Sequence, residues 1–210
     1  GREYYGVYPL RGKCKNVRDV SVKQLLSNQE FNHIKKILGL QQGVSYKSVR
    51  DLRYGRLMIM TDADNDGSHI KGLIVNMFQY FWKSLLELGF VVSMVTPIIK
   101  ATKSAKTMSF YTDTTFREWY KSHSNQGWKI KYYKGLGTST SKEAREYFGN
   151  IEKLTVTFEA DPKTDESIIL AFDKSKSDDR KKWLTNNAPR PEIGLVILKN
   201  YPLQISYIMT

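Results

Sequence analysis

The sequence predicts an α/β fold in which a mostly parallel sheet is flanked by helices, with small additional helical and strand insertions. Short apolar segments rich in Val, Ile, Phe and Tyr alternate with longer segments whose apolar residues recur at helical spacing. Strands separated by helices usually pair in parallel, because the helix carries the chain back across the sheet. At 210 residues the chain is long enough for one sizeable core or two small ones.

Each predicted element has a local signal in the sequence. The strongest is a long helix on which Ile70, Leu73 and Met77 share one face. Thr140 and Glu143 form a capping box, which marks the start of another helix. The Lys-, Ser- and Thr-rich segment 100–107 is expected to be a mobile loop. The predicted helices are 21–28, 29–39, 68–88, 114–123, 140–148, 166–172 and 177–184, and the predicted strands are 57–61, 90–95, 108–112, 128–133 and 154–158.

The charge and cysteine content narrow the class of protein. The formal net charge is +12, and residues 1–60 hold 12 basic against 4 acidic residues. Such a positive excess attracts phosphate backbones, although a solvated basic face without a partner remains open. Cys14 is the single cysteine, so the chain contains no internal disulfide. With no apolar segment of membrane-spanning length, we expect a soluble intracellular protein, or a fragment of one, that does not bind membranes.

Three aspartates, Asp62, Asp64 and Asp66, follow the apolar strand at 57–61 and predict a divalent-metal site. Side chains two positions apart on extended backbone point to the same side, so the three carboxylates would share one edge. Oxygen ligands suit Mg²⁺, Mn²⁺ or Ca²⁺. An EF-hand calcium loop is excluded, because its last position requires Glu and the sequence has Leu73 there. A solvated acidic turn without a metal remains an alternative.

A second motif, Lys134-Gly-Leu-Gly-Thr138, lies at a predicted strand-to-helix junction. Glycines at such a junction let backbone N–H groups approach an anion, and a following helix N-terminus favours phosphate. The motif lacks the spacing of a P-loop, so an ordinary turn remains the alternative.

Four motifs in a fixed order carry a more specific signal than any one alone. They are Pro9-Leu-Arg-Gly-Lys13, Asp62-Ala-Asp-Asn-Asp-Gly67, Lys134-Gly-Leu-Gly-Thr138 and Asp178-Asp-Arg-Lys181. Together they closely resemble the TOPRIM region of eukaryotic-type (type IIA) DNA topoisomerase II, which has a Rossmann-like fold. The resemblance covers residues 1–187, which we expect to form the TOPRIM domain. Residues 188–210 are expected to be a tail that leads toward a further domain.

The resemblance implies a metal-binding part of an ATP-dependent enzyme that cuts both strands of one DNA duplex, passes another through and reseals the break. By motif position Asp62 and Asp64 would bind Mg²⁺, with Asp66 supporting, and Mn²⁺ or Ca²⁺ could substitute. The family's metal-binding Glu, its nucleophilic tyrosine and its ATP site are expected outside this chain, so no catalytic residue is assigned and the isolated fragment is expected to be inactive. Tyr54 is interpreted as structural, and His69 as either a phosphate contact or a packing residue.

The resemblance also implies double-stranded DNA as a partner and a homodimeric full-length enzyme. Residues matching DNA contacts of the family are Lys13, Asn16, Arg180 and Lys181. Charge and location add Arg11 and Lys134. The enzyme would lie in the nucleus of a cell, or in the host cytoplasm if a virus encodes it. Two alternatives remain: a TOPRIM nuclease or primase, and a non-catalytic DNA-binding module with a structural acidic cluster.

Overall fold

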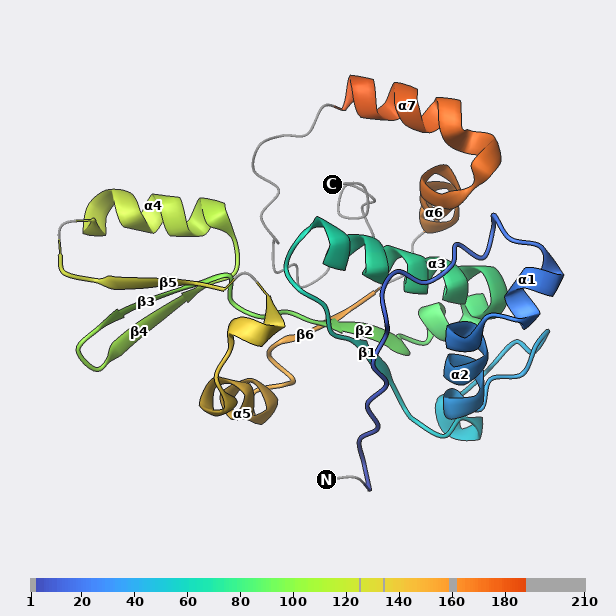
Figure 1. The fold of residues 1–210 in the computed structure, drawn as a ribbon, viewed down its shortest axis with the longest axis horizontal. Helices are drawn as coiled ribbons and strands as arrows, with labels where there is room; N and C mark the ends of the chain where they lie inside the picture. The colour runs from blue at the N-terminus through green and yellow to red at the C-terminus, as the bar shows by residue number, and fades with distance from the viewer. Residues whose placement is uncertain (1–2, 125, 134, 159–161, 188–210) are drawn as a thin grey trace.

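Two small sheets and the helices around them form the structure, a computed structural model that describes residues 3–124, 126–133, 135–158 and 162–187 (Figure 1). Short 3-10 turns lie at Val49–Asp51, Leu136–Thr138 and Lys174–Lys176. The helices and strands are α1 Val22–Leu26, α2 Gln29–Leu38, β1 Leu57–Ile59, α3 Asn65–Glu87, β2 Val91–Met94, β3 Ile99–Lys103, β4 Lys106–Phe110, α4 Asp113–His123, β5 Lys129–Tyr132, α5 Ser141–Gly149, β6 Thr155–Thr157, α6 Thr164–Phe172 and α7 Ser177–Asn186.

The central sheet has the strand order β1-β2-β6 and is mixed. Strands β1 and β2 are parallel, with Leu57 opposite Val91, because α3 connects them. Strand β6 joins β2 in the antiparallel direction, with Val156 opposite Ser93. The α/β class is thus confirmed, but among the described residues the parallel part is a single strand pair, a smaller share than the helix–strand alternation suggested.

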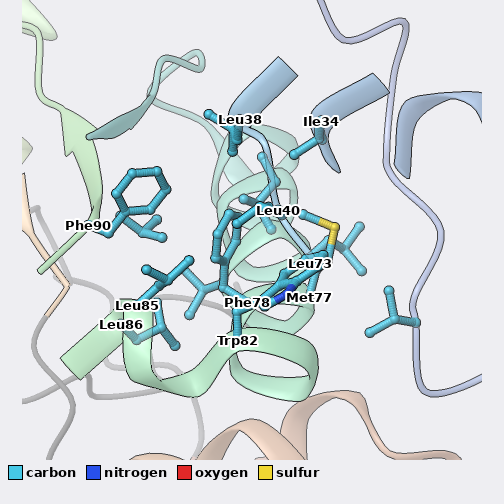
Figure 2. Close-up of a cluster of buried hydrophobic side chains, with 14 of the residues drawn as sticks. Ile34, Leu38, Leu40, Leu73, Met77, Phe78, Trp82, Leu85, Leu86 and Phe90 are labelled. Atoms are coloured by element: carbon cyan, nitrogen blue, oxygen red, sulfur yellow. The ribbon is translucent and has the colours of Figure 1, made fainter. Parts of the chain in front are cut away.

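Helix α3 forms the centre of the main core. Its apolar face, predicted from the 3.6-residue period, includes the fully buried side chains of Phe78, Trp82 and Leu85 (Figure 2). Trp82 also donates from Nε1 to the carbonyl oxygen of Gln41, at 2.8 Å, so its one polar atom is satisfied. The core is completed from α2 and from the start of β2, by Ile34, Leu38, Phe90 and Val91 among others.

The second sheet has the order β4-β3-β5 and is antiparallel throughout, with α4 beside it (Figure 1). It overturns the prediction of a mobile loop at 100–107, because Ile99–Lys103 is the central strand. Polar side chains hid this strand in the sequence: Lys100 is a lysine, yet it is 6% exposed, and Ala101 is fully buried. A tight turn joins β3 to β4, with Lys103 opposite Lys106, and this requires the antiparallel direction.

No helix among the described residues is long and apolar enough to cross a membrane. The predicted tail, residues 188–210, lies outside the described residues, as does Lys134.

Candidate functional site

The three aspartates follow β1 but do not continue it. The strand ends at Ile59, and α3 begins at Asn65, three residues before the predicted start. Asp64 is the N-cap of α3, where its Oδ1 accepts from the backbone N–H of Gly67 at 2.7 Å. Asp66 lies in the first helical turn. The expectation that strand alternation aligns all three carboxylates is therefore wrong, because the capping Asp64 turns the chain into a helix.

Gly67 allows this sharp turn. A Cβ atom at Gly67 would lie 2.0 Å from the carbonyl oxygen of Asp62 and 3.0 Å from Oγ1 of Thr61. No side chain fits at that distance, so the strand-to-helix turn requires glycine. The turn places Asp62 beside the start of α3.

The glycine motif at 135–137 lies against the Asp62 carboxylate. The backbone N–H of Leu136 donates to Asp62 Oδ1 at 2.7 Å. A Cβ atom at Gly135 would lie 2.6 to 2.8 Å from the three atoms of that carboxylate, so a larger residue here would displace the exposed Asp62 side chain. The sequence left open whether these glycines bring backbone N–H groups to an anion such as phosphate or form an ordinary turn. In the structure the anion is the side chain of Asp62, 74 positions earlier in the chain.

Asp66 is paired with a basic residue. Its Oδ1 lies 2.7 Å from Nζ of Lys13, and both side chains are exposed. The hydrogen bond and the positive charge of Lys13 lower the pKa of Asp66, so this carboxyl is ionised at neutral pH. Next to it, burial and the nearby Lys13 lower the pKa of His69, whose ring stacks on Phe172. His69 thus has a packing partner within the protein.

The donor atoms of Asp62 and Asp64 fit a hard cation. Both residues are exposed, and the described hydrogen bonds to each use one carboxylate oxygen, Oδ1. Mg²⁺ commonly takes one or two protein carboxylates and completes its shell with water and phosphate oxygens. Among the described residues no three His, Cys, Asp or Glu side chains are grouped closely enough to hold a metal. Asp62 and Asp64 would hold the ion, while Asp66 faces Lys13.

An open pocket brings several of the predicted residues together. It lies between the segment at 13–19, the start of α3 and the helices α6 and α7. Apolar groups of Leu73 and Phe172 contribute to its lining. The candidate residues that line it are Lys13, Asn16, Asp66, His69 and Arg180. Among the described candidates, Arg11, Asp62, Asp64 and Lys181 do not line it.

The side chain of Asn16 is fully engaged within the protein. Its Nδ2 donates to the carbonyl oxygen of Phe172 at 2.7 Å and to Asp19 at 2.8 Å. Its Oδ1 accepts from the backbone N–H of Arg18 and from Nδ2 of Asn76. An amide side chain has two donor hydrogens and two acceptor lone pairs, so a hydrogen bond to DNA would have to replace one of these four.

Asn16 belongs to a polar network that sequence reasoning missed. Asn76 is fully buried on α3, and its Oδ1 accepts from Nε of Arg18 at 2.7 Å. Arg18 also donates to Gln79, which donates in turn to Asp165 of α6. The network joins the basic N-terminal segment to α3 and α6. The one available signal was Asn76, a polar residue on the apolar face of the predicted helix.

Arg180 and Lys181 have different environments. The guanidinium of Arg180 donates to the carbonyl oxygens of Leu170, Ala171 and Asp173, which closes the C-terminal end of α6. Among the described residues, the side chain of Lys181 forms an exposed pair with Asp178, at 3.1 Å. Such a pair contributes little to stability and leaves the ammonium accessible.

Comparisons with known proteins identify the family of the chain. The Toprim domain family matches residues 1–97, and the family described as the C-terminal associated domain of TOPRIM matches residues 94–207. DNA topoisomerase 2-beta of Homo sapiens is 56% identical over 191 residues, which cover 89% of this chain and 12% of that protein. DNA topoisomerase 2 of Bombyx mori is 53% identical over 204 residues, which cover 93% of this chain and 13% of that protein. The chain thus spans about an eighth of the length of these relatives.

A solved structure extends the similarity to three dimensions. The Plasmodium falciparum topoisomerase II DNA-binding, cleavage and re-ligation domain superposes with a TM-score of 0.85 at 49% identity, and the match covers 89% of this chain and 26% of that one. The order of motifs, the fold and both family matches therefore agree. The chain belongs to the family described as the C-terminal associated domain of TOPRIM, preceded by a Toprim domain match, and it is similar to the corresponding region of eukaryotic-type DNA topoisomerase II.

Proposed function

We propose that this chain is the metal-binding part of an ATP-dependent type II DNA topoisomerase, which cleaves both strands of a duplex, passes a second duplex through and rejoins the ends. The single observation that best supports this is the position of Asp62. Its carboxylate lies at the end of the β1 segment, it is held by the Leu136 N–H, and Asp64 follows at the N-terminus of α3. Ligands of α/β proteins commonly bind at this end of a parallel strand.

In this proposal Asp62 and Asp64 bind Mg²⁺. When bound, the ion would supply a Lewis acid that stabilises negative charge on the phosphate and on the leaving oxygen during strand cleavage. The Leu136 N–H orients the carboxylate of Asp62, and Gly135 leaves room for that carboxylate. The Gly67 N–H fixes Asp64 in the same way. Preset ligands lose less conformational freedom on binding, which favours the bound state.

We propose that double-stranded DNA lies along the basic N-terminal segment and α7. Lys13, Arg11 and Lys181 have exposed side chains that can reach phosphates. Asn16 and Arg180 are proposed to act from within the protein, by holding the backbone that presents these cations. Lys134 remains a proposed contact on the ground of its charge. The full-length enzyme is proposed to be a homodimer that binds ATP outside this chain and acts in the nucleus, or in the host cytoplasm if viral.

The chemistry of the cut ends tests the reaction class. A type II topoisomerase traps its DNA as protein-linked ends when the reaction is stopped with detergent, whereas a nuclease releases free ends. We expect the full-length enzyme with Mg²⁺ to give protein-linked double-strand breaks that rejoin when the metal is chelated before the detergent is added. Free, unrejoined ends would instead assign the chain to a TOPRIM nuclease.

A further inference from the structure

Glu143 of α5 lies at the junction of β5, α5 and the glycine motif between them. Its side chain is 17% exposed, and both carboxylate oxygens accept hydrogen bonds. No part of the proposed function uses this residue. Its partners come from both ends of the segment that carries Gly135 and Leu136.

On the strand side, two residues of the β5 segment reach Glu143. Tyr133 donates from its hydroxyl to Oε1, and Lys131 donates from Nζ to Oε2 at 3.2 Å. The Tyr133 backbone N–H is bonded to the carbonyl oxygen of Ile98 at 2.8 Å, so the tyrosine is fixed to the sheet. Lys100, a buried residue of β3, lies 3.7 Å from Oε1 and adds a positive charge. The carboxylate is thereby anchored to the second sheet.

On the helix side, Glu143 closes the capping box of α5. Its Oε2 accepts from the backbone N–H of Thr140 at 2.8 Å, and Oγ1 of Thr140 accepts from the Glu143 N–H at 3.2 Å. Thr140 lies two residues after Thr138, the last residue of the glycine motif. One carboxylate therefore joins the residues that precede the motif to those that follow it.

The tip of the same segment contacts the proposed metal ligand. Between the two ends, the N–H groups of Thr138 and Ser139 bond back to the carbonyl oxygens of Gly135 and Leu136, so the tip is a compact turn. This turn presents the Leu136 N–H to Asp62 Oδ1. Gly135 also lies close against this carboxylate, so a shift of the turn would lengthen the Leu136 bond unless the Asp62 side chain moved with it.

We propose that Glu143 is a positioning residue for the metal site. By closing the base of the turn, it fixes the Leu136 N–H against Asp62 and so sets the orientation of the carboxylate that binds the ion. The inference rests on the proposed metal role of Asp62. Partners that orient a metal ligand commonly change metal affinity by about 10- to 100-fold when they are removed.

The substitution Glu143→Gln separates this role from the stability of α5. Glutamine can close a capping box, as Gln24 does with Ser21 in α1 of this chain. It cannot accept with both terminal atoms, because one is an NH₂ group. Because Thr140 and Lys131 both donate to Oε2, the variant should keep these bonds through its amide oxygen and lose the acceptor for the Tyr133 hydroxyl. Tyr133→Phe removes one strand-side donor and leaves Glu143 in place. Glu146→Gln is the matched control, since Glu146 is on the same helix, is 61% exposed and lies 3.6 Å from Lys100.

Two measurements on the full-length enzyme test the proposal without using its activity. The first is amide hydrogen exchange of peptides that cover 135–140 in the metal-free protein. The second is Mn²⁺ binding to the nucleotide-free protein by electron paramagnetic resonance, with Asp62→Ala defining the share of binding that depends on Asp62. We expect Glu143→Gln to speed amide exchange and to lower the Mn²⁺ affinity of the Asp62-dependent site by about tenfold. Tyr133→Phe should act in the same direction, and Glu146→Gln should match the wild type.

The outcomes separate the two claims. If Asp62→Ala removes Mn²⁺ binding while Glu143→Gln and Tyr133→Phe leave both exchange and binding unchanged, the positioning role is wrong and the metal site stands. Faster exchange with unchanged Mn²⁺ affinity also overturns it, because the turn would then be free to move without affecting Asp62. If Asp62→Ala leaves Mn²⁺ binding unchanged, the metal assignment itself fails, and the role of Glu143 fails with it.

Discussion

Nζ of Lys13 lies 2.7 Å from Oδ1 of Asp66, so a residue predicted to contact DNA neutralises one predicted to support the metal. Both side chains are exposed, and exposed ion pairs contribute little to stability. A phosphate group can therefore take the place of Asp66 at Lys13. In the proposed function, Lys13 would exchange its partner Asp66 for a phosphate of DNA.

The substitution Lys13→Ala should weaken DNA binding by the full-length enzyme. One lost phosphate contact should reduce the slope of log affinity against log salt concentration by about 1. Lys36→Ala, an exposed position on α2 away from the pocket, serves as the control. Fluorescence anisotropy over a range of salt concentrations measures both slopes. Equal slopes for Lys13→Ala and the wild type would remove Lys13 from the contacts.

Asn16→Ala should act mainly on stability. It leaves Asn76, which is fully buried, without the acceptor for its Nδ2, and it frees the carbonyl oxygen of Phe172. An unsatisfied buried polar group costs about 1–3 kcal/mol. Thermal unfolding of the chain, followed by circular dichroism, should show the loss. Unchanged stability combined with a lower salt slope for DNA binding would instead assign Asn16 to direct contact.

Arg180 and Lys181 are adjacent, yet their alanine variants should differ. Arg180→Ala removes the donors to three carbonyl oxygens at the end of α6 and should lower the unfolding free energy by about 1–3 kcal/mol. Lys181→Ala removes only an exposed pair and should lower DNA affinity without a measurable change in stability. Thermal unfolding and DNA titration of both variants decide the matter. Similar behaviour of the two in both assays would contradict the assignment.

The acid stability of the chain should depend on Glu143. Burial opposes its ionisation, but hydrogen bonds from Thr140, Tyr133 and Lys131 outweigh this and lower its pKa from 4.5 to about 2. A lowered pKa stabilises the folded state at any pH above the pKa of the unfolded chain. This stabilisation is lost as the pH falls from about 4.5 toward 2. With solvent screening the loss is roughly 1–2 kcal/mol. Glu143→Gln should reduce the pH dependence of the unfolding free energy over this interval. A wild-type slope in the variant would exclude Glu143 as the source of that pH dependence.

Periodicity and capping signals predicted the helices well, because α3, α4 and α5 are set by local patterns and local caps. The strand β3 was missed, since burial of Lys100 depends on Glu143 and Glu146, which lie more than 40 positions away. The aspartate motif was placed correctly after β1, but the turn at Asp64 changed its geometry. The hydrogen bonds of Asn16 and Arg180 within the protein could not be predicted either. Asn16 bonds to Phe172, which is distant in the sequence, and Arg180 bonds to carbonyl oxygens at the end of α6.

In the proposed function, Asp62 binds the ion that DNA cleavage requires. The most direct test of this role is the amount of protein-linked double-strand breaks formed by the full-length Asp62→Ala enzyme across a Mg²⁺ titration, beside Asp113→Ala, an exposed aspartate on α4. We expect Asp62→Ala to lower cleavage by at least about 100-fold at Mg²⁺ concentrations that saturate the wild type, and Asp113→Ala to cleave normally. Cleavage by Asp62→Ala with the wild-type yield and the wild-type Mg²⁺ dependence would contradict this role.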